Sequence, residues 1–501
     1  MKINPLLLLS LLLLTYCLHA QPRGSGLDYD PKKVTKQASK PLLIKGDYAN
    51  LPASVSFEQY APTTGDQGAY MTGVAFATSY HMRTMIAAIQ GGITNTQQIT
   101  QMVFSPSYIY EQLKYESGMD CKSKINAFDA LDLVKEKGVA TLKTVPYQCG
   151  IKISTNADDE AANYRIADYQ TLFKADETNA YVKIQTVKKA LSEGFPVLMA
   201  AYCPPSFYNL GKKGVWEPAP AEKPADSMDK NMMVVVGYDD KKLKDGAFRV
   251  LNSWGSKWGD RGFCWVKYAD WANYVLFAIQ VYPTPKGQSA AATESTVEPV
   301  GPVALQGKVS FQTIDNMVMP AGRLLLRNLE VDNGGTKKAE PSPSPAPGED
   351  LVAYRMKNAY SSGTRFRMLV NNAFPAYVYA FATDLSGEVH KILPASDDVS
   401  PLLGKNNTVA FPSESGAIRM DNNPGKDYLL ILYSQKPLDA STLLAKMSQT
   451  SGGLSAKIRA ALGNELMPAR YISYTPDDVG FAVNAQAKGS VVPLMVEITH
   501  R

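Results

Sequence analysis

The sequence predicts an α+β domain followed by a mostly-β domain of the sandwich type. From Leu51 to about Pro283, helix-like segments come first and strand-like segments follow, which is typical of an α+β domain. Residues 284–302 are rich in Ala, Thr, Ser, Gly and Pro and lack hydrophobic periodicity, as expected of a linker. After them the apolar runs are short and rich in aromatic and β-branched residues, which indicates strands. A chain of 501 residues has room for two such cores.

These changes in composition divide the chain into five predicted segments. They are a signal peptide (1–20), a polar leader arm (21–47), the α+β domain (48–283), a linker (284–303) and the β-rich domain (304–501). A second Pro/Ser-rich stretch, residues 341–347, is assigned to a loop inside the last domain, because strand-like runs precede it.

The N-terminus has the pattern of an export signal. Lys2 supplies a positive start, residues 6–14 are leucine apart from one serine, and the small Ala20 lies at the expected cleavage point. The apolar run is too short to span a bilayer but has the length of a signal-peptide core. We therefore expect an exported protein, located in the periplasm, on the cell surface or outside the cell. Lipid attachment at Cys17 is a less favoured alternative, because the preceding Tyr16 is bulky.

Four cysteines remain after the expected cleavage, all in the first domain. They are Cys121, Cys149, Cys203 and Cys264. An oxidising compartment favours pairing, and four cysteines allow three connectivities. Cys121 with Cys149 is the first candidate pair, on proximity in sequence alone.

Helices and strands are predicted from periodicity and end signals. Gly73–Ile89 is apolar on almost all sides, so we expect a buried helix. Ala127–Lys137 and Lys183–Glu193 are helices that each end at a glycine. Strands of the first domain are expected at 196–202, 232–238, 248–252 and 263–268. In the β-sandwich expected next, strands are predicted at 365–370, 376–381, 428–433, 471–475, 479–483 and 491–498, with short helices at 441–447 and 456–462.

Several function classes have little support in the sequence. The formal net charge is only +5 and no Lys/Arg run is interleaved with aromatic residues, so nucleic-acid binding is not expected. No segment after the signal has 18 consecutive apolar residues, so no membrane span is expected. The remaining histidines, His81, His390 and His500, show no ligand spacing, so we expect no metal or other cofactor.

Six short motifs in residues 48–283 carry a resemblance to a known family. They lie at 51–56 (LPASVS), 65–68 (GDQG) with 74–76 (VAF), 104–110 (FSPSYIY), 146–147 (PY), 236–238 (VGY) and 252–255 (NSWG) with 258–263. Taken in this order, they resemble the papain family of cysteine peptidases. The resemblance implies a papain-like, two-lobed fold with a cleft.

The chemistry of that family requires a set of side chains in the cleft. A thiolate at a helix N-terminus attacks, a histidine shares its proton, a third group orients the histidine, and donors face the oxyanion. By resemblance, Gln67 matches the oxyanion glutamine, Asn252 the histidine-orienting asparagine, and Trp254 the tryptophan that shields this contact. A structural role in holding the lobes together is an equally weighted alternative for Gln67 and Asn252, and core packing is the expected role of Trp254.

The two central positions of this set depart from the family. The nucleophile position is Gly73 and the histidine position is Asn231. Glycine has no side chain, and asparagine cannot accept a proton near neutral pH. No cysteine lies between Cys17 and Cys121. His81 is eight residues along the helix from Gly73, roughly 12 Å away at the helical rise. The sequence therefore predicts that no catalytic set is intact.

Four residues are weighed as substitutes. Thr72 places a hydroxyl beside the vacant position in the cleft but has no apparent base. Asp229 lies near Asn231, where a solvated turn residue is expected. Cys203 and Cys264 are free-thiol candidates, although a disulfide or a buried core position is favoured for both.

The second domain resembles a bacterial family of β-rich domains of unknown function. The similarity rests on residues 362–366, on 377–379 with Gly387 and 393–394, and on 425–428 with 433–434. It covers about residues 304–501 and implies no catalytic residues. We find no nucleophile or acid–base pair there from sequence.

Three functional hypotheses follow. The first is an exported pseudopeptidase that binds a peptide, protein or envelope ligand in the cleft without cleaving it. The second is an active cysteine-type peptidase or other hydrolase with non-standard catalytic residues. The third is a scaffold whose cleft has filled in, with Met71, Met232 and Met233 as candidate plugs.

Overall fold

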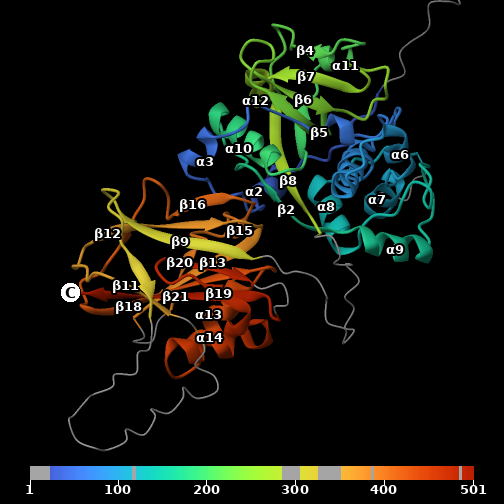
Figure 1. Ribbon diagram of the computed structural model, residues 1–501. Coiled ribbons are helices and arrows are strands. Elements are labelled where there is room, and N and C mark those ends of the chain that lie inside the picture. Colours follow the sequence, from blue (N-terminus) through green and yellow to red (C-terminus); the bar gives the residue numbers. More distant parts are fainter. Residues whose placement is uncertain are drawn as a thin grey trace, which may run out of the picture.

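The computed structural model describes residues 23–115, 120–284, 305–324, 351, 353–384, 389–483 and 488–501. The expected signal peptide with Cys17, the linker beyond residue 284 and the 341–347 loop lie outside these residues. The described chain forms a first domain of helices and one sheet, and a second domain of two sheets (Figure 1). No helix of the described residues is long and apolar enough to cross a membrane.

One long buried helix organises the helical part of the first domain. It consists of α4 (Gly73–Ala75), the π-helical η2 (Phe76–Arg83) and α5 (Thr84–Gly91). This confirms the predicted helix from Gly73, which continues two residues further than expected. All of its residues from 73 to 86 are buried, as its apolar sequence requires.

Shorter helices surround this central helix. They are α6 (Thr96–Gln101), α7 (Pro106–Leu113), α8 (Ala127–Glu136) and α9 (Thr155–Ala161). Ser105 and Asn126 cap α7 and α8 by accepting hydrogen bonds from Tyr108 N–H and Phe128 N–H, as their residue types favour.

The sheet of the first domain has the strand order β2-β8-β3-β5-β6-β7-β4, and β1 pairs with β5. The strands are β1 (Ser54–Ser56), β2 (Ile166–Thr171), β3 (Val197–Tyr202), β4 (Val215–Trp216), β5 (Lys230–Asp239), β6 (Ala247–Leu251), β7 (Phe263–Lys267) and β8 (Val275–Pro283). The helices α10 (Ala180–Ser192), α11 (Pro205–Tyr208) and α12 (Tyr268–Tyr274) belong to this part. All four predicted strands are confirmed. β2 and β8, which pair with each other, were missed.

The second domain is a β-sandwich with two helices on one outer face. One sheet has the order β10-β11-β21-β18-β13-β14 with β15 beside β13, and the other has the order β16-β12-β9-β20-β19 with β17 beside β12. Residues of both sheets form one buried core, which confirms the predicted sandwich. The helices α13 (Ala440–Gln449) and α14 (Leu454–Leu462) pack on aromatic residues of the first of these sheets.

Six strands of the sandwich, β12, β13 and β18 to β21, lie close to their predicted positions, and the other seven were not predicted individually. They are β9 (Gln306–Thr313), β10 (Ala321–Arg323), β11 (Ala353–Met356), β12 (Arg365–Asn372), β13 (Ala376–Thr383), β14 (His390–Leu393), β15 (Leu402–Leu403), β16 (Asn407–Phe411), β17 (Ile418–Arg419), β18 (Gly425–Ser434), β19 (Ile472–Tyr474), β20 (Val479–Val483) and β21 (Val491–His500).

Residues 23–48, which we call the arm, pack into both domains. The arm includes α2 (Pro31–Thr35) and reaches α3 (Lys45–Ala49). Leu27 belongs to the core of the first domain, and Leu43 belongs to the core of the second. The sequence predicted only a polar leader arm at residues 21–47 and no contact with either core. The structure buries it through main-chain hydrogen bonds and through apolar side chains of the arm that enter both cores.

Lys40 of the arm forms a buried ion pair where the two domains meet. Its Nζ lies 2.7 Å from Glu193 Oε1 and donates to Gln280 Oε1 at 2.9 Å. Burial lowers the pKa of Lys40, and Glu193 opposes this effect. The adjacent Ser39 N–H donates to Asp398 O, and Ser400 N–H donates to Ser39 O. The arm therefore anchors the sandwich to the first domain.

We expect Lys40→Met to destabilise the protein by about 3–5 kcal/mol, because it leaves the Glu193 carboxylate buried without its cation. The double variant Lys40→Met/Glu193→Gln should recover most of this loss. Urea unfolding of the full chain, read at its first transition, measures the effect.

Lys33→Met is the matched control for this prediction. Lys33 pairs with Asp129, but both side chains are more than one third exposed (39% and 38%), so its loss should cost less than about 1 kcal/mol. An equal effect of both variants would contradict the assigned role of Lys40.

Candidate functional site

The first N–H group of the central helix has no partner within the helix and bonds to the arm instead. Gly73 is the first residue of α4, and Thr72 before it provides no side-chain cap. The first N–H groups of a helix have no partner within the helix. The Gly73 N–H donates instead to the carbonyl oxygen of Ser25, at 2.9 Å.

Gln67 supplies a second donor to the same oxygen. Its Nε2 donates to Ser25 O at 2.9 Å and to Tyr70 O at 2.8 Å. Ser253 Oγ donates to Gln67 Oε1 at 2.6 Å and so orients the amide. Two fixed donors, one from the helix and one from Gln67, therefore converge on a single carbonyl oxygen, the arrangement that stabilises an oxyanion in acyl transfer.

Asn231 and Asn252 form an amide pair beside Gly73. Asn231 Nδ2 donates to Asn252 Oδ1 at 3.1 Å, and Ser253 N–H donates to the same oxygen at 2.9 Å. Both asparagines are fully buried. Asn231 Oδ1 and Asn252 Nδ2 have no hydrogen-bond partner. Neither amide titrates near neutral pH, so this pair cannot take a proton from a nucleophile.

The space in front of Gly73 is already occupied. A Cβ on Gly73 would overlap with Asn231 Oδ1 and with Ser25 O. Of the residues predicted as plugs, Met232 and Met233 lie in the hydrophobic core, and Met71 only approaches Ser25, with Sδ 4.0 Å from Ser25 Oγ. The arm backbone and the Asn231 amide fill the place of a nucleophile side chain.

Gly24, the residue before Ser25, is held by hydrogen bonds of its main chain. Gly24 N–H donates to Gly68 O at 3.0 Å, and Trp254 Nε1 donates to Gly24 O at 2.8 Å. The ring of Trp254 stacks on Tyr208, with the centroids 4.6 Å apart. Trp254 therefore does more than pack: its indole N–H positions the arm.

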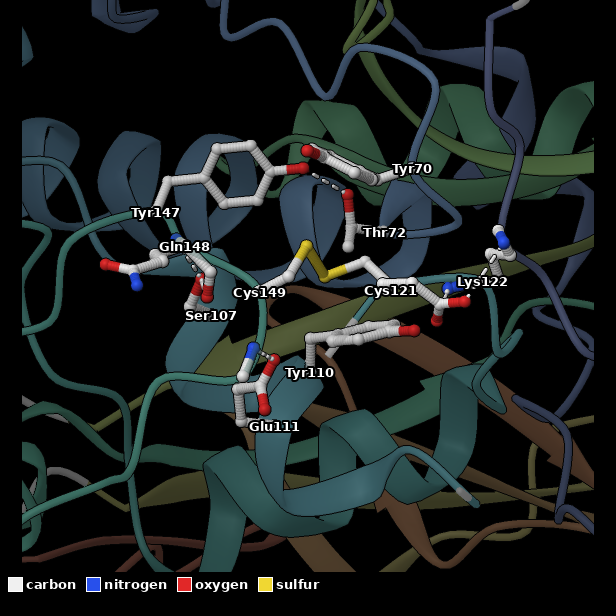
Figure 2. The surroundings of a disulfide bond; sticks show 12 residues. Tyr70, Thr72, Ser107, Tyr110, Glu111, Cys121, Lys122, Tyr147, Gln148 and Cys149 are labelled. Carbon is white, nitrogen blue, oxygen red and sulfur yellow. Dashed lines mark hydrogen bonds and ion pairs between the residues drawn. A yellow bond between two sulfur atoms is a disulfide. The ribbon is translucent and has the colours of Figure 1, made fainter. Parts of the chain in front are cut away.

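The disulfide between Cys121 and Cys149 supports the other side of the arm (Figure 2). Cys121 O accepts from Met71 N–H at 2.8 Å. Four residues further on, Ile125 N–H donates to Gly26 O, and Ile125 O accepts from Asp28 N–H. The cross-linked loop thus holds the chain before Gly73 through Met71. It also holds the arm on both sides of Leu27, which forms a parallel β-bridge with Ile125.

Thr72, the predicted hydroxyl substitute, is buried and engaged (Figure 2). Its Oγ1 lies 2.8 Å from Tyr147 Oη, and Tyr147 donates its own proton to Gln67 O at 3.0 Å. Since a phenol has one proton, Thr72 is the donor in their contact. Burial raises the pKa of Tyr147, so Tyr147 is not a base for Thr72.

The other candidate groups are not arranged for catalysis. Cys203 and Cys264 are free and buried, and burial raises the pKa of both thiols, to about 12 for Cys264. Asp229 lies 3.6 Å from Lys124 in an ion pair. His81 is buried, its pKa is lowered to about 3 by burial, and its Nε2 accepts from Gly65 N–H. Among the described residues no acidic, His or Cys cluster could hold a metal ion.

Sequence reasoning missed two groupings. The first is the arm at Gly73, for which the only signal was the pair of glycines flanking Ser25. The second lies in the sandwich, where Ser362 Oγ is 3.0 Å from His500 Nε2 and His500 Nδ1 is 3.3 Å from Asp427. Our sequence expectation of no such grouping in this domain is therefore wrong. The Ser362 N–H is used by Arg501 O, so it is not free to face an oxyanion.

Comparison with protein families gives two matches. The profile of the papain family cysteine proteases matches residues 61–282. The profile of a domain of unknown function, DUF4384, matches residues 359–437. The first match includes Gln67, Gly73, Asn231 and Asn252, so the departures at Gly73 and Asn231 lie inside the matched region.

Individual proteins give weaker similarity. Gamete and mating-type specific protein A of Dictyostelium discoideum is 27% identical over 151 residues, which are 30% of this chain and 30% of that protein. Xylellain, a cysteine protease from Xylella fastidiosa, aligns over 54% of this chain and all of its own, with 21% identity and a TM-score of 0.41. Procathepsin B from Trypanosoma congolense aligns over 52% and 87%, with 18% identity and a TM-score of 0.40.

We predict that Gly73→Ala displaces residues 23–27 of the arm without unfolding the domain. The added Cβ overlaps with Ser25 O, whereas alanine is the better helix former by about 1 kcal/mol. Hydrogen exchange of the amides of Gly24 and Asp28 should become at least about tenfold faster as this segment opens locally. Mass spectrometry of the full chain measures this.

Gly46→Ala is the matched control for this variant. Gly46 lies in the same arm, and a Cβ there meets only a side-chain carbon, at 3.8 Å. Unchanged exchange in Gly73→Ala, or an equal increase in Gly46→Ala, would show that Gly73 does not seat the arm.

Proposed function

We propose that the first domain, whose residues 61–282 match the profile of the papain family cysteine proteases, is an exported pseudopeptidase. It binds an extended polypeptide segment between the central helix and β5 and does not cleave it. The observation that carries this proposal is the Ser25 carbonyl oxygen, which accepts hydrogen bonds from Gly73 N–H and Gln67 Nε2. The donors for a peptide carbonyl are present, but the groups that would attack it are not.

Both groups that exchange the proton in acyl transfer, the nucleophile and the base, are absent from the positions of Gly73 and Asn231. An acyl transfer needs a nucleophile and a base within hydrogen-bond reach of each other. Gly73 offers no nucleophile, and Asn231 offers an amide instead of an imidazole. The hydroxyl of the preceding residue, Thr72, donates to Tyr147 and contacts no base. Retained donors without attacking groups support binding over hydrolysis.

Export is part of the same proposal. The leucine-rich N-terminus supports it by its length and charge. The disulfide between Cys121 and Cys149 is consistent with an extracellular protein. We accordingly place the protein in the periplasm, on the cell surface or in the medium, with cleavage after Ala20 in preference to lipid attachment at Cys17.

An active hydrolase with rebuilt chemistry is the second candidate. It is favoured by Gln67 and Asn252, which keep the residue types that the resemblance assigns to the oxyanion and histidine-orienting positions. It would need Thr72, Cys203 or Cys264 as nucleophile, and both thiols are buried with raised pKa values. Single replacements of these three residues by alanine test it: a hydrolytic activity lost in one of them would favour this candidate over the pseudopeptidase.

We expect no turnover of unfolded, fluorescently labelled casein by the purified chain. In an active enzyme, removing one oxyanion donor lowers kcat about 100- to 1000-fold. Here Gln67→Ala should leave the measured rate at the same background as the unaltered protein. A thiol-reactive peptidase inhibitor should have no effect either. Inhibitor-sensitive cleavage that disappears in Gln67→Ala would falsify the pseudopeptidase proposal.

A further inference from the structure

The site beside Gly73 recognises a main chain. We call it the arm site, formed by Gln67, Gly68, Gly73, Ile125 and Trp254. Its groups donate hydrogen bonds to the carbonyl oxygens of Gly24, Ser25 and Gly26. They also accept hydrogen bonds from the N–H groups of Gly24 and Asp28. This pattern resembles peptide recognition by strand addition, in which main-chain bonds give affinity.

Sterics make the arm site selective for glycine at two positions. A Cβ on Gly24 would overlap with the carbonyl of Tyr70, and a Cβ on Gly26 would overlap with the carbonyl of Met71. Both obstacles are backbone atoms, which cannot rotate away. Gly26 also has φ +120°, a region that other residues rarely adopt.

The flanking positions favour small and aliphatic side chains. Ser25 is buried at 1% exposure, and Leu27 lies in the hydrophobic core at 3% exposure. A polar atom also faces the bound segment without a partner: Asn231 Oδ1 is fully buried, unpaired and directed at the place where Gly73 and Ser25 meet. The arm site is therefore built around a ligand.

We propose that the arm site is a receptor for extended peptides of the pattern Gly-Ser-Gly-Leu and that residues 23–27 are its resident ligand. An external peptide of this class binds by displacing its own counterpart in the arm. The inference rests on the proposed function, because it requires that the bound peptide is not cut. It adds the class of peptide that binds and the competition between that peptide and residues 23–27 for the arm site.

The rest of the arm stays in place when this segment leaves. Asp30 caps α2, Lys33 pairs with Asp129, and Lys40 and Leu43 are buried next to the second domain. The segment is thus a tethered competitor with a high effective concentration. If it occupies the site nine times in ten, the apparent affinity of an external peptide falls about tenfold.

The probe is the hexapeptide Arg-Gly-Ser-Gly-Leu-Asp, acetylated, amidated and carrying a fluorophore, with Arg-Val-Ser-Val-Leu-Asp as its matched control. Binding is measured by fluorescence anisotropy on the full chain and on Gly26→Val, which blocks the arm from its own site. Gly46→Ala serves as the neutral arm variant. Hydrogen exchange at Gly24 reports whether the arm has left.

We expect the probe to bind Gly26→Val at least about tenfold more tightly than the unaltered chain or Gly46→Ala. The valine-containing peptide should bind none of them. Adding Gly73→Ala to Gly26→Val should abolish binding, because the site itself is then blocked. Equal binding of both peptides, or no binding to Gly26→Val after its arm has opened, overturns the inference.

One further outcome separates this inference from the proposed function. The probe is recovered after incubation and weighed by mass spectrometry. An intact peptide that fails to bind contradicts only the ligand class. A cleaved peptide contradicts the pseudopeptidase itself, whatever its affinity.

Discussion

The carbonyl oxygen of Ser25 is the point on which the site depends. It accepts from the N–H at the start of the central helix and from Gln67, whose amide is oriented by Ser253. The positive end of the helix dipole adds to both bonds. Because the helix is buried from Gly73 to Ile86 and Gln67 is fully buried, these donors are fixed before any ligand arrives. Fixed donors of this kind give affinity without a cost of reorganisation.

The glycine at position 73 makes this contact possible. Any Cβ there would strike the Ser25 carbonyl and the Asn231 amide together. A nucleophile and this bound arm therefore exclude each other sterically. Replacing the histidine by Asn231 fits the same picture, since a neutral amide bonds to Asn252 without introducing a charge. The two departures from the family pattern thus have one physical consequence, a space that accepts a peptide backbone.

Sequence reasoning identified the folds and pointed to Gly73 and Asn231 as departures from the family pattern, but it did not predict the occupant of the site. The central helix, the strands β3, β5, β6 and β7, and the sandwich could be predicted because their apolar residues follow a helical or strand pattern. Gly73 and Asn231 could be located because flanking motifs fix their register. The arm has no such periodic pattern. Its segment at Gly24, Ser25 and Gly26 is held by main-chain hydrogen bonds, which Gly and Ser make as well as any residue. The contact between Ser362, His500 and Asp427 was missed because strand pairing brings together residues far apart in the chain.

Retained oxyanion donors have a different meaning once the attacking groups are absent. An enzyme gains rate only from interactions that are stronger in the transition state than in the ground state. Without a nucleophile no tetrahedral oxyanion forms at Ser25, so all of the donor energy goes into holding a neutral carbonyl. The same two hydrogen bonds that would lower a barrier become ground-state binding energy. Since the arm glycines Gly24 and Gly26 let the backbone approach this closely, this geometry supports the peptide receptor that we propose.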